Sequence, residues 1–578
     1  MEQSSIFKGV FGKYLGKPVA KSYVGNKWDY KGNRAEIDAI MIPVISPING
    51  KIIGYVAEAT EEQMDLAGKS AKRAQEYWYL NVGQQEKEKI FLAFRNYIRI
   101  YRGKLAKTMI WEMGKPAMTA DGEVQELLDT INHYFGELSR IEGEFSECQA
   151  ANKMGAVLKS PYGVVYAIAP WNFPLAISIG WKMLAAVTAG NSVVLKACSQ
   201  SPFTAAIGVA LFQEAVRGVL GEEIYNKHLC CLVQLIQGSG SKTGSAYLKN
   251  GHYDLAAFTG GKNTGAEIGR ICGEKIKPHH LELAGHRAIV VFEDFDVDRA
   301  VSEAIIAGTG DAGQRCVSAR VVFVEESIYD KFIEKYLFAL KNRRIGNPLD
   351  VETQIGPLAN KSQLLRVAEM VEKAKNDCEK SVSGVILDAS NAATLVYYGE
   401  YIGGVILDNK KAIREARANH WNIGDINPNG CYYLPAVLID PPMDSPAMKE
   451  EIFGPVLCIK PFGGKTREEK IKNAADLVNA SNYGLSNAVL THHLPTAFQL
   501  MKLIKTGILY IGRGTSGAEL NRYFGGVKDS GHGREGKGVD AYVYKKQIYF
   551  DYHPEARLAQ VGAAEEVMKT LKEAKTIF

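Results

Sequence analysis

The chain has 578 residues, of which 46% are hydrophobic and 23% are charged, so it is globular and long enough to form two or three lobes. Its 69 basic and 64 acidic residues leave a net charge of +5, and because the basic residues are scattered, this balance gives no support to a nucleic-acid partner. Nine cysteines without paired Cys-x-x-Cys motifs argue against a disulfide framework and a structural metal site, and they favour a reducing cytoplasm.

The first third of the chain is predicted to be mostly helical. The N-terminus of the chain shows no basic-then-apolar signal, and no apolar run in the sequence approaches the roughly 20 residues that span a membrane. We therefore expect a soluble cytoplasmic protein without membrane contact. A short strand is predicted over 39–44, and helices are predicted over 61–113 and 122–141. Apolar residues in the first helical region fall at spacings that suit a buried stripe: Tyr77, Tyr79, Ile90, Leu92, Phe94, Tyr97 and Ile98.

Between residues 164 and 292 the pattern changes to short apolar runs that alternate with helical stretches. Strands are predicted over 164–169, 192–195, 231–236 and 255–258, with helices between them, which implies βαβ units and a parallel sheet. Glycine-rich turns at 238–240 and 258–261 follow two of these strands, at the place where dinucleotides bind in such sheets. The first turn runs into Ser-Lys-Thr-Gly but lacks the spacing of a phosphate-binding loop, so a nucleoside triphosphatase is disfavoured.

A second αβ series is predicted from Ala288 to about Asn479, with strands over 288–292 and 319–324. Residues 383–431 have weak periodicity and many Gly, Asn and Tyr residues, which predicts a long surface excursion. The tail from Ala563 is amphipathic, and it is interpreted as a docking helix rather than a membrane anchor.

Three side chains are candidates for one covalent mechanism. Cys316 follows Gly-Gln-Arg, and the adjacent Arg315 would favour a thiolate nucleophile. Glu282 lies in an apolar Leu-Glu-Leu run that should raise its pKa, as suits a general base. Asn172, in Pro-Trp-Asn-Phe-Pro, could hold an oxyanion. Each also has an ordinary structural interpretation, as an inert buried thiol, a structural carboxylate and a helix cap.

Lys196 ends a Val-Val-Leu-Lys strand, where its ammonium could hold the ribose hydroxyls of a dinucleotide. Ser199 lies three positions further on, and no carboxylate is adjacent to reject a 2′-phosphate. The sequence therefore leaves both NAD and NADP open.

These segments, in their order along residues 42–558, resemble the aldehyde dehydrogenase superfamily. The matching pieces are Pro-Trp-Asn-Phe-Pro, the Lys196 strand, Phe-Thr-Gly, Leu-Glu-Leu-Ala-Gly, Gly-Gln-Arg-Cys, Ile-Gly-Asn-Pro, Glu-Glu-Ile-Phe-Gly-Pro and Phe-Gly-Gly-Val-Lys. The resemblance implies the α/β aldehyde dehydrogenase fold. It predicts a Rossmann-like cofactor-binding domain (1–142 and 163–284), an α/β catalytic domain (285–510) and a small oligomerisation or C-terminal element (143–162 and 511–578).

The resemblance also implies the chemistry, which is NAD- or NADP-dependent oxidation of an aldehyde to a carboxylic acid without a metal. Cys316 would attack the aldehyde, Asn172 and the Cys316 backbone N–H would hold the oxyanion, and Glu282 would activate the water that hydrolyses the thioester. The residues that it implies for the cofactor are Trp171, Lys196, Ser199, Gly238, Thr259, Gly260, Gly261, Glu451 (for the nicotinamide ribose) and Phe453.

Within the superfamily, Gly-Glu-Val-Gln-Glu at 122–126 and Thr-Ser-Gly-Ala-Glu at 515–519 resemble the α-aminoadipic semialdehyde dehydrogenases, the antiquitin branch. For such a substrate, Glu126 would meet the ammonium, while Arg315 and the backbone of Ser516, Gly517 and Ala518 would meet the carboxylate. Departures at Ala197, Gly261 and Ala284 bear on cofactor preference and on oligomer packing rather than on the chemistry.

Three alternatives remain open. One is glutamate γ-semialdehyde (pyrroline-5-carboxylate) dehydrogenase, whose Arg-Gly-Thr-x-Gly-Ala anchor has a counterpart at 513–518. Another is a broad-range aldehyde dehydrogenase, and the third is a catalytically idle structural or binding protein of the same fold. The resemblance further implies a small-molecule aldehyde as partner and a homodimer or homotetramer.

Overall fold

The computed structural model describes residues 5–30, 34–380, 401–533, 535–536, 538–554 and 564–574. It divides the chain into two units, one formed by Met1–Ile141 with Pro161–Val543 and the other by Glu142–Ser160 with Tyr544–Phe578. Residues 511–543, which the sequence assigns to the C-terminal element, lie in the larger unit, and the predicted domain boundaries stay predictions.

The N-terminal segment forms a small sheet in the order β1-β2-β6-β5, followed by a run of helices. The strand predicted over 39–44 is confirmed as β5, and the predicted helices are confirmed as four helices in succession. The elements are β1 (Phe11–Tyr14), β2 (Lys17–Ala20), α1 (Arg34–Ile40), β5 (Met41–Ile45), β6 (Ile52–Ala57), α2 (Glu61–Asn81), α3 (Gln84–Ile100), α4 (Arg102–Met113) and α5 (Ala117–Glu137).

The predicted helical stripe is partly wrong. Ile90, Phe94 and Ile98 are buried as expected, but Tyr79 and Leu92 are 45% and 49% exposed. The helix is interrupted between α2 and α3, so one apolar stripe cannot run through both helices. Leu92 lies two positions from Ile90 and therefore on a different face of α3.

The first large sheet has eight strands in the order β24-β13-β12-β9-β10-β11-β3-β4. Its central strands are parallel, and β9 pairs with both β10 and β12, so the strand order reverses there. Ligands bind beyond the carboxyl ends of strands at such a reversal. The strands are β3 (Ser22–Val24), β4 (Lys27–Asp29), β9 (Val164–Ile168), β10 (Ser192–Lys196), β11 (Val233–Ile236), β12 (Leu255–Thr259), β13 (His279–Glu282) and β24 (Gly531–His532).

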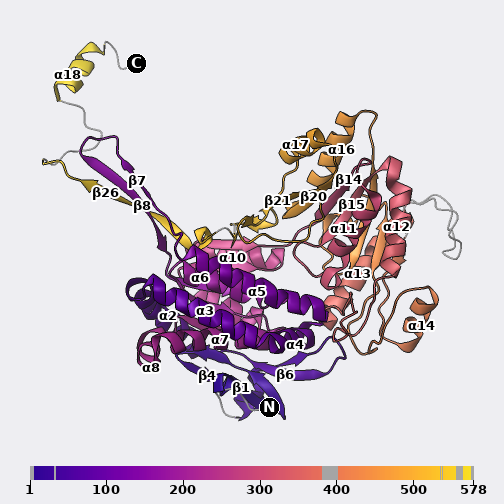
Figure 1. Cartoon of the computed structure of the whole chain (residues 1–578), viewed down its shortest axis with the longest axis horizontal. Coiled ribbons are helices and arrows are strands. Elements are labelled where there is room, and N and C mark those ends of the chain that lie inside the picture. Colours follow the sequence, from indigo (N-terminus) through magenta and orange to yellow (C-terminus); the bar gives the residue numbers. More distant parts are fainter. Residues whose placement is uncertain are drawn as a thin grey trace. The chain divides into compact units, whose positions relative to one another are not determined.

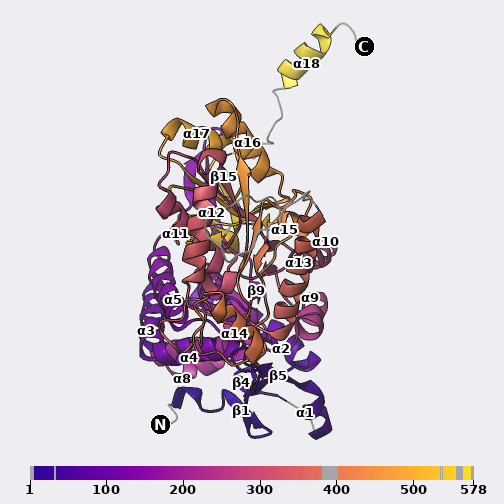
Figure 2. The same ribbon diagram turned by 90° about the vertical axis from the view of Figure 1, so that its right-hand side faces the viewer.

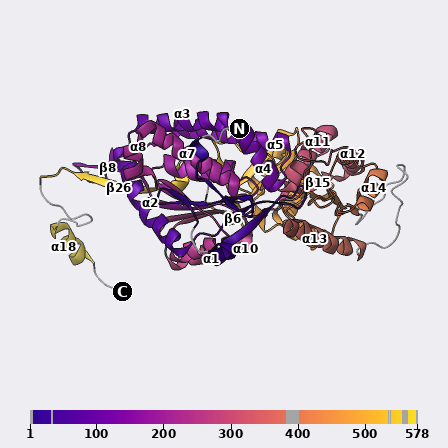
Figure 3. The same cartoon turned by 90° about the horizontal axis from the view of Figure 1, so that it is seen from below.

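Helices cover both faces of this sheet, because alternate strand residues are apolar on both sides. Val165 and Ala167 of β9 pack in the same core as α3, α5 and α7 (Pro202–Leu220). Tyr166 of β9 and Ala256 of β12 pack in a separate core with α10 (Lys262–Glu274). Figure 3 shows α3 and α7 on one side of the strands and α10 on the other. The predicted parallel sheet is confirmed for the central strands.

Helix α7 is an apolar segment of 19 residues, whereas no apolar run of that length was expected from the sequence. By length and composition alone it could cross a membrane. However, 72% of its most apolar window is buried inside the protein, as in the core helix of a soluble fold. It packs against α3 and β11, so its apolar side chains are accounted for by the core.

The second large sheet has seven strands in the order β16-β17-β18-β15-β14-β20-β21. Figure 2 shows α11 and α12 on one side of β15 and α13 and α15 on the other. The strands are β14 (Arg287–Val291), β15 (Ala319–Glu325), β16 (Tyr401–Gly403), β17 (Ala436–Ile439), β18 (Val456–Phe462), β20 (Ser486–Leu490) and β21 (Ile508–Ile511). The helices are α11 (Val297–Thr309), α12 (Tyr329–Lys341), α13 (Lys361–Lys380), α14 (Lys410–Ala418), α15 (Pro446–Lys449), α16 (Arg467–Asn479) and α17 (Leu494–Leu503).

The prediction of a surface excursion over 383–431 is wrong for the second half of that segment. Strand β16 pairs with β17, and the side chains of Leu407, Trp421 and Cys431 are buried in the core of the second sheet. Irregular segments make these contacts, which explains the weak periodicity of the sequence there. Residues 383–400 lie outside the part of the chain that the structure describes.

The smaller unit contains a three-stranded sheet in the order β26-β8-β7. Strands β7 (Glu144–Glu147) and β8 (Lys153–Pro161) form an antiparallel pair, and β26 spans Val543–Asp551. The helix predicted from Ala563 is confirmed as α18 (Ala564–Glu573), whereas its docking role stays a prediction. Figure 1 labels all of these elements.

Candidate active site

A cavity of about 920 Å³ lies at the carboxyl ends of the first sheet's strands. Every residue predicted for catalysis or for the cofactor lines it, except Gly238. The residues concerned are Trp171, Asn172, Lys196, Ser199, Thr259, Gly260, Gly261, Glu282, Cys316, Glu451 and Phe453.

The strand register of the first sheet places its cavity residues along one edge of the sheet. Lys196 at the end of β10 lies opposite Ile168 at the end of β9, and Glu282 at the end of β13 lies opposite Thr259 at the end of β12. Parallel strands that end together place the following loops along one edge of the sheet, which is why residues far apart in the sequence share this wall.

The second sheet contributes through the opposite ends of its strands. Arg287 is the first residue of β14, Cys316 lies just before β15, and Glu451 and Phe453 lie just before β18. These three strands are adjacent and parallel, so their amino ends form the facing wall of the cavity.

The turn before Cys316 is conformationally unusual. Asp311 and Ala312 have φ of 50° and 54°, and Gly313 has φ of 70°. A Cβ on Gly313 would overlap the carbonyl oxygen of Gly454, so only glycine allows the two loops to approach this closely. The glycine of the Gly-Gln-Arg-Cys motif therefore joins the loop of Cys316 to the loop of Glu451 and Phe453.

The Cys316 thiol lies among charges of both signs. Burial raises its pKa to about 12, and the cation that most strongly opposes this rise is Arg287. The carboxylates of Glu282 and Glu451 raise the pKa further. Arg315, the adjacent cation expected to favour the thiolate, also interacts with Cys316, while its guanidinium forms an ion pair with Asp311 at 2.6 Å.

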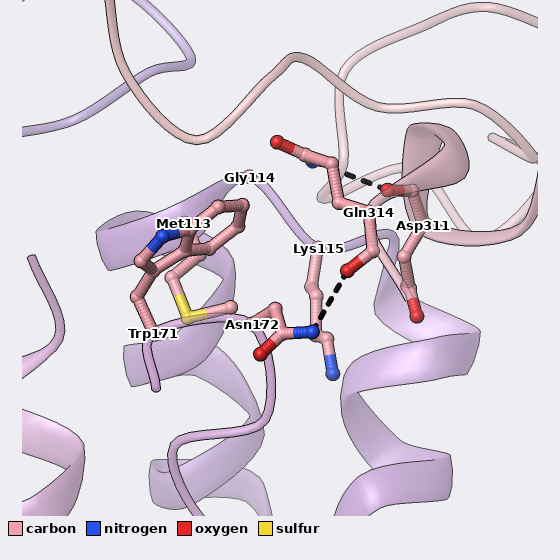
Figure 4. Close-up of a pocket in the computed structure, with 7 residues that line it drawn as sticks. All are labelled: Met113, Gly114, Lys115, Trp171, Asn172, Asp311 and Gln314. Atoms are coloured by element: carbon pink, nitrogen blue, oxygen red, sulfur yellow. Dashed lines mark hydrogen bonds between the residues drawn. The ribbon is translucent and has the colours of Figure 1, made fainter. Parts of the chain in front are cut away.

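Asn172 is fixed next to the loop of Cys316. Its Nδ2 donates to the backbone oxygen of Gln314 at 3.0 Å, as Figure 4 shows, and both residues line a small void of about 10 Å³. Gln314 is held in turn, since its Oε1 accepts from the Ala359 backbone N–H at 2.9 Å. This network places the Asn172 amide beside the segment that carries the nucleophile.

The helix-cap interpretation of Asn172 is excluded, because a buried carboxylate that the sequence did not single out takes that position. Glu123 Oε1 accepts from the backbone N–H groups of Leu175 and Ala176, at 2.8 and 3.0 Å. These groups open the π-helical segment η2 (Ala176–Leu184). Glu123 also forms a buried ion pair with Lys115, whose ammonium lies 3.7 Å from the centre of the Phe173 ring. Glu123 and Lys115 thus hold the Pro-Trp-Asn-Phe-Pro segment in place.

Lys196 is buried, and its ammonium donates to the backbone oxygens of Ala197 and Gly238 at 2.6 Å each. Burial lowers its pKa to about 8. Gly238 thus orients the lysine without lining the cavity, while Gly240 and Ser241 of the same loop do line it. A neighbouring carboxylate that sequence spacing could not reveal, Glu58, accepts from the backbone N–H of Ser239 at 2.9 Å.

Gly261 immediately precedes α10, so the amino end of a helix faces the cavity. Backbone N–H groups at such an end, together with the helix dipole, favour the phosphates of a ligand. The aromatic rings of Trp171 and Phe453 meet edge to face at 5.6 Å on the cavity wall.

The residues predicted for the substrate do not line the large cavity, but several are linked to Cys316. Glu126 raises the pKa of Cys316, and its Oε1 accepts from Trp181 Nε1 at 3.2 Å. Thr515 Oγ1 donates to the Val317 backbone oxygen at 2.7 Å, which ties the neighbouring Ser516 to the nucleophile loop. Gly517 and Ala518 are exposed.

Two buried arginines, Arg287 and Arg320, were also missed from the sequence. Both form ion pairs with Glu451. The only local signal for them is a cation at the start of an apolar strand, which is too common to indicate a site.

A sheet with a dinucleotide-type strand reversal, a buried lysine at its edge, and a facing thiol with a carboxylate and an amide define a cofactor-dependent oxidoreductase that uses a cysteine. The pattern of the aldehyde dehydrogenase family matches residues 35–409 and 408–548, so the chain belongs to that family.

Relatives of the whole chain agree. A D-glyceraldehyde dehydrogenase (NADP(+)) from Thermoplasma acidophilum is 29% identical, with 92% of this chain and 96% of the relative covered. Aldehyde dehydrogenase family 7 member B4 from Arabidopsis thaliana is 28% identical, with 93% and 95% covered. The crystal structure of an Escherichia coli NADP-dependent enzyme superposes with a TM-score of 0.78 at 28% identity, covering 92% of this chain and 98% of that one. The expected aldehyde dehydrogenase fold is confirmed.

Proposed function

We propose that this aldehyde dehydrogenase oxidises an amino-acid semialdehyde, α-aminoadipic semialdehyde, to the carboxylic acid with NAD or NADP as hydride acceptor. The observation that carries the proposal is the shared cavity of Cys316, Glu282 and Lys196, with Glu126 and Arg315 grouped around the same thiol.

The chemistry follows from the residues on the cavity wall. The Cys316 thiolate adds to the aldehyde carbon, and the oxyanion that forms accepts hydrogen bonds from the Asn172 amide and the Cys316 backbone N–H. A nicotinamide held at Glu451 and Phe453 would supply the acceptor for the hydride of that carbon, and Cys316 would then carry the acyl group as a thioester. Glu282 then removes a proton from water, whose oxygen attacks the thioester carbon and releases the acid and the thiolate.

The cavity fits a dinucleotide. Lys196 offers a buried cation for ribose hydroxyls, Gly261 and the start of α10 offer N–H groups for phosphates, and Glu451 offers a carboxylate near Cys316. Ser199 stands where a carboxylate would reject a 2′-phosphate, whereas Glu58 places a carboxylate near Lys196 from another segment. NAD and NADP both remain in the proposal, and two of the relatives are named for NADP.

An amino-acid semialdehyde brings an ammonium and a carboxylate at the end remote from the aldehyde. Glu126 is the carboxylate proposed for the ammonium, and Arg315 with the Ser516–Ala518 backbone is proposed for the carboxylate. Glutamate γ-semialdehyde is the second candidate, because Arg513 Nη2 donates to the Ser516 oxygen at 2.8 Å and so orders the same anchor. The two substrates differ by one methylene, which is worth about 1–3 kcal/mol of discrimination.

The test compares α-aminoadipic semialdehyde, glutamate γ-semialdehyde and hexanal, each with NAD and with NADP, by the absorbance of the reduced cofactor. We expect the highest kcat/KM for α-aminoadipic semialdehyde. In Cys316→Ala, oxidation should fall to background while NADH or NADPH binding, followed by fluorescence, is retained.

A wild-type protein that binds cofactor but oxidises none of the three aldehydes would instead support an idle binding protein. Equal kcat/KM for hexanal and for both semialdehydes would support a broad-range enzyme.

We also propose a cytoplasmic homodimer or homotetramer. The smaller unit carries exposed aromatic side chains, Phe145 and Phe550, whose rings contact one another at 6.2 Å and suit a second copy of the chain. All cysteines in the described part of the chain are free thiols, as expected in a reducing compartment.

A further inference from the structure

Arg287 is a buried cation on the wall of the catalytic cavity. It begins β14, its side chain is 1% exposed, and the cavity that it lines also contains Cys316 and Glu282. A buried guanidinium is costly unless its charge and its N–H groups are used.

Part of that requirement is met by contacts on one side of the guanidinium. Nη1 donates to the backbone oxygen of Gly285 at 2.5 Å and to Oε1 of Glu451. A Cβ on Gly285 would lie 2.7 Å from Nε of Arg287, so glycine at that position makes room for the guanidinium against the backbone.

The other side of the guanidinium packs against the backbone of Gly285. Within the described residues, Nε and Nη2 are buried and have no hydrogen-bond partner. Leaving a buried donor unsatisfied costs about 1–3 kcal/mol, so the Glu451 contact carries much of what stabilises this charge in the protein.

Glu451 is held so that one carboxylate oxygen carries both arginine contacts. Arg320 Nη2 lies 3.6 Å from the same Oε1 that Arg287 contacts. Arg320 itself donates to the backbone oxygens of Gly313 and Gly454, at 2.7 and 3.0 Å, and so joins the two loops. Because both arginines use Oε1, Oε2 is the oxygen left for a ribose hydroxyl.

The charges around Cys316 give Arg287 a second effect. The carboxylates of Glu282, Glu451 and Glu126 have the opposite effect and raise the pKa of the Cys316 thiol. Tyr510 also interacts with this thiol. Arg315 and Arg320 interact with Cys316 as well, but Arg315 is paired with Asp311. The single carboxylate of Glu451 is shared by Arg287 and Arg320, so these three side chains together keep one positive charge. Arg287 is the cation with the largest effect on the thiol.

We propose that Arg287 is a positioning residue of this enzyme, which orients Glu451 toward the nicotinamide half of the cofactor and supplies the positive charge beside Cys316. The inference rests on the proposed function for the cofactor, but not on the identity of the aldehyde.

The test uses the full-length protein with Arg287→Gln, Arg287→Lys and Glu451→Gln. A matched control is Arg102→Gln, which removes the same charge from a half-exposed ion pair with Asp121. The first measurement is the pH dependence of Cys316 alkylation by iodoacetamide without cofactor, followed by mass spectrometry. The second is the Kd of NADH and NADPH by fluorescence.

In Arg287→Gln the alkylation profile should move to higher pH by about one unit, because loss of an adjacent cation disfavours the thiolate. Cofactor binding should weaken about tenfold, because Glu451 loses the charged hydrogen bond that orients it. Arg287→Lys should restore the pH profile but not the cofactor affinity, since a lysine keeps the charge and loses the planar donors. Glu451→Gln should move the profile to lower pH, and Arg102→Gln should change neither measurement.

A folded Arg287→Gln protein with an unchanged pH profile and an unchanged Kd would overturn the proposal. If Arg287→Gln does not fold, the other two variants decide: the proposal fails if Arg287→Lys binds cofactor like wild type and Glu451→Gln leaves the profile in place. Neither readout needs an aldehyde, so failure of the proposed substrate would leave these results intact.

Discussion

Glu126, the carboxylate proposed to recognise the substrate ammonium, is not a solvated helix side chain. Burial raises its pKa, the nearby Glu123 raises it further, and Lys115 and Arg315 act in the opposite direction. A ligand ammonium would relieve the cost of burying this charge, because it adds an opposite charge at short range.

We therefore expect Glu126→Gln to raise the KM for α-aminoadipic semialdehyde about tenfold, which corresponds to one charged hydrogen bond. The KM for hexanal, which has no ammonium, should change little. The measurement is steady-state kinetics on both aldehydes. Asp129→Asn is the control, since Asp129 lies on the same helix, is exposed and accepts from Gln125. Equal increases for both aldehydes would exclude a recognition role.

At the scale of elements, the site depends on the helix start that follows Asn172. Glu123 of α5 satisfies two backbone N–H groups there and neutralises the buried Lys115. Removing one partner of such a pair leaves an uncompensated buried charge, which costs about 3–5 kcal/mol.

Glu123→Gln should therefore lower the free energy of unfolding by about 3 kcal/mol, because Lys115 loses its counter-charge in the core. It should also lower kcat, since the segment that carries Asn172 loses its anchor. The checks are denaturant unfolding and steady-state kinetics. In contrast, Asp121→Asn, also on α5, breaks the half-exposed pair with Arg102 of α4 and should cost less than about 1 kcal/mol. Similar losses in the two variants would contradict this account.

At the scale of the whole molecule, the exposed aromatic residues of the smaller unit bear on assembly. Phe145 is 68% exposed and Phe550 is 50% exposed, and large apolar side chains that cluster at a surface commonly mark an interface. Ion pairing between Glu144 and Lys545 at 3.2 Å joins the two strands that carry them.

The double variant Phe145→Lys with Phe550→Lys should lower the solution mass toward that of a single chain, because two charges would be buried at the interface between copies. Light scattering after size-exclusion chromatography measures this mass. As a control, Leu15→Lys places one charge at an apolar side chain that is 63% exposed outside the smaller unit, and it should leave the mass unchanged. A wild type that is already monomeric would refute the oligomer.

Local patterns in the chain were sufficient to identify the parallel sheet, its strand ends and four candidate residues: Cys316, Glu282, Asn172 and Lys196. The reason is that short motifs, and apolar strands that alternate with helices, are properties of contiguous residues. The tertiary structure decided what depends on segments far apart. Arg287 meets Glu451 across 164 positions, and Glu123 meets Leu175 across 52. It also showed that residues 401–431 are partly in the core and that the stripe through Leu92 is interrupted. A buried charge is stable only beside its partner, so the position of each such residue becomes meaningful only when the fold brings that partner to it.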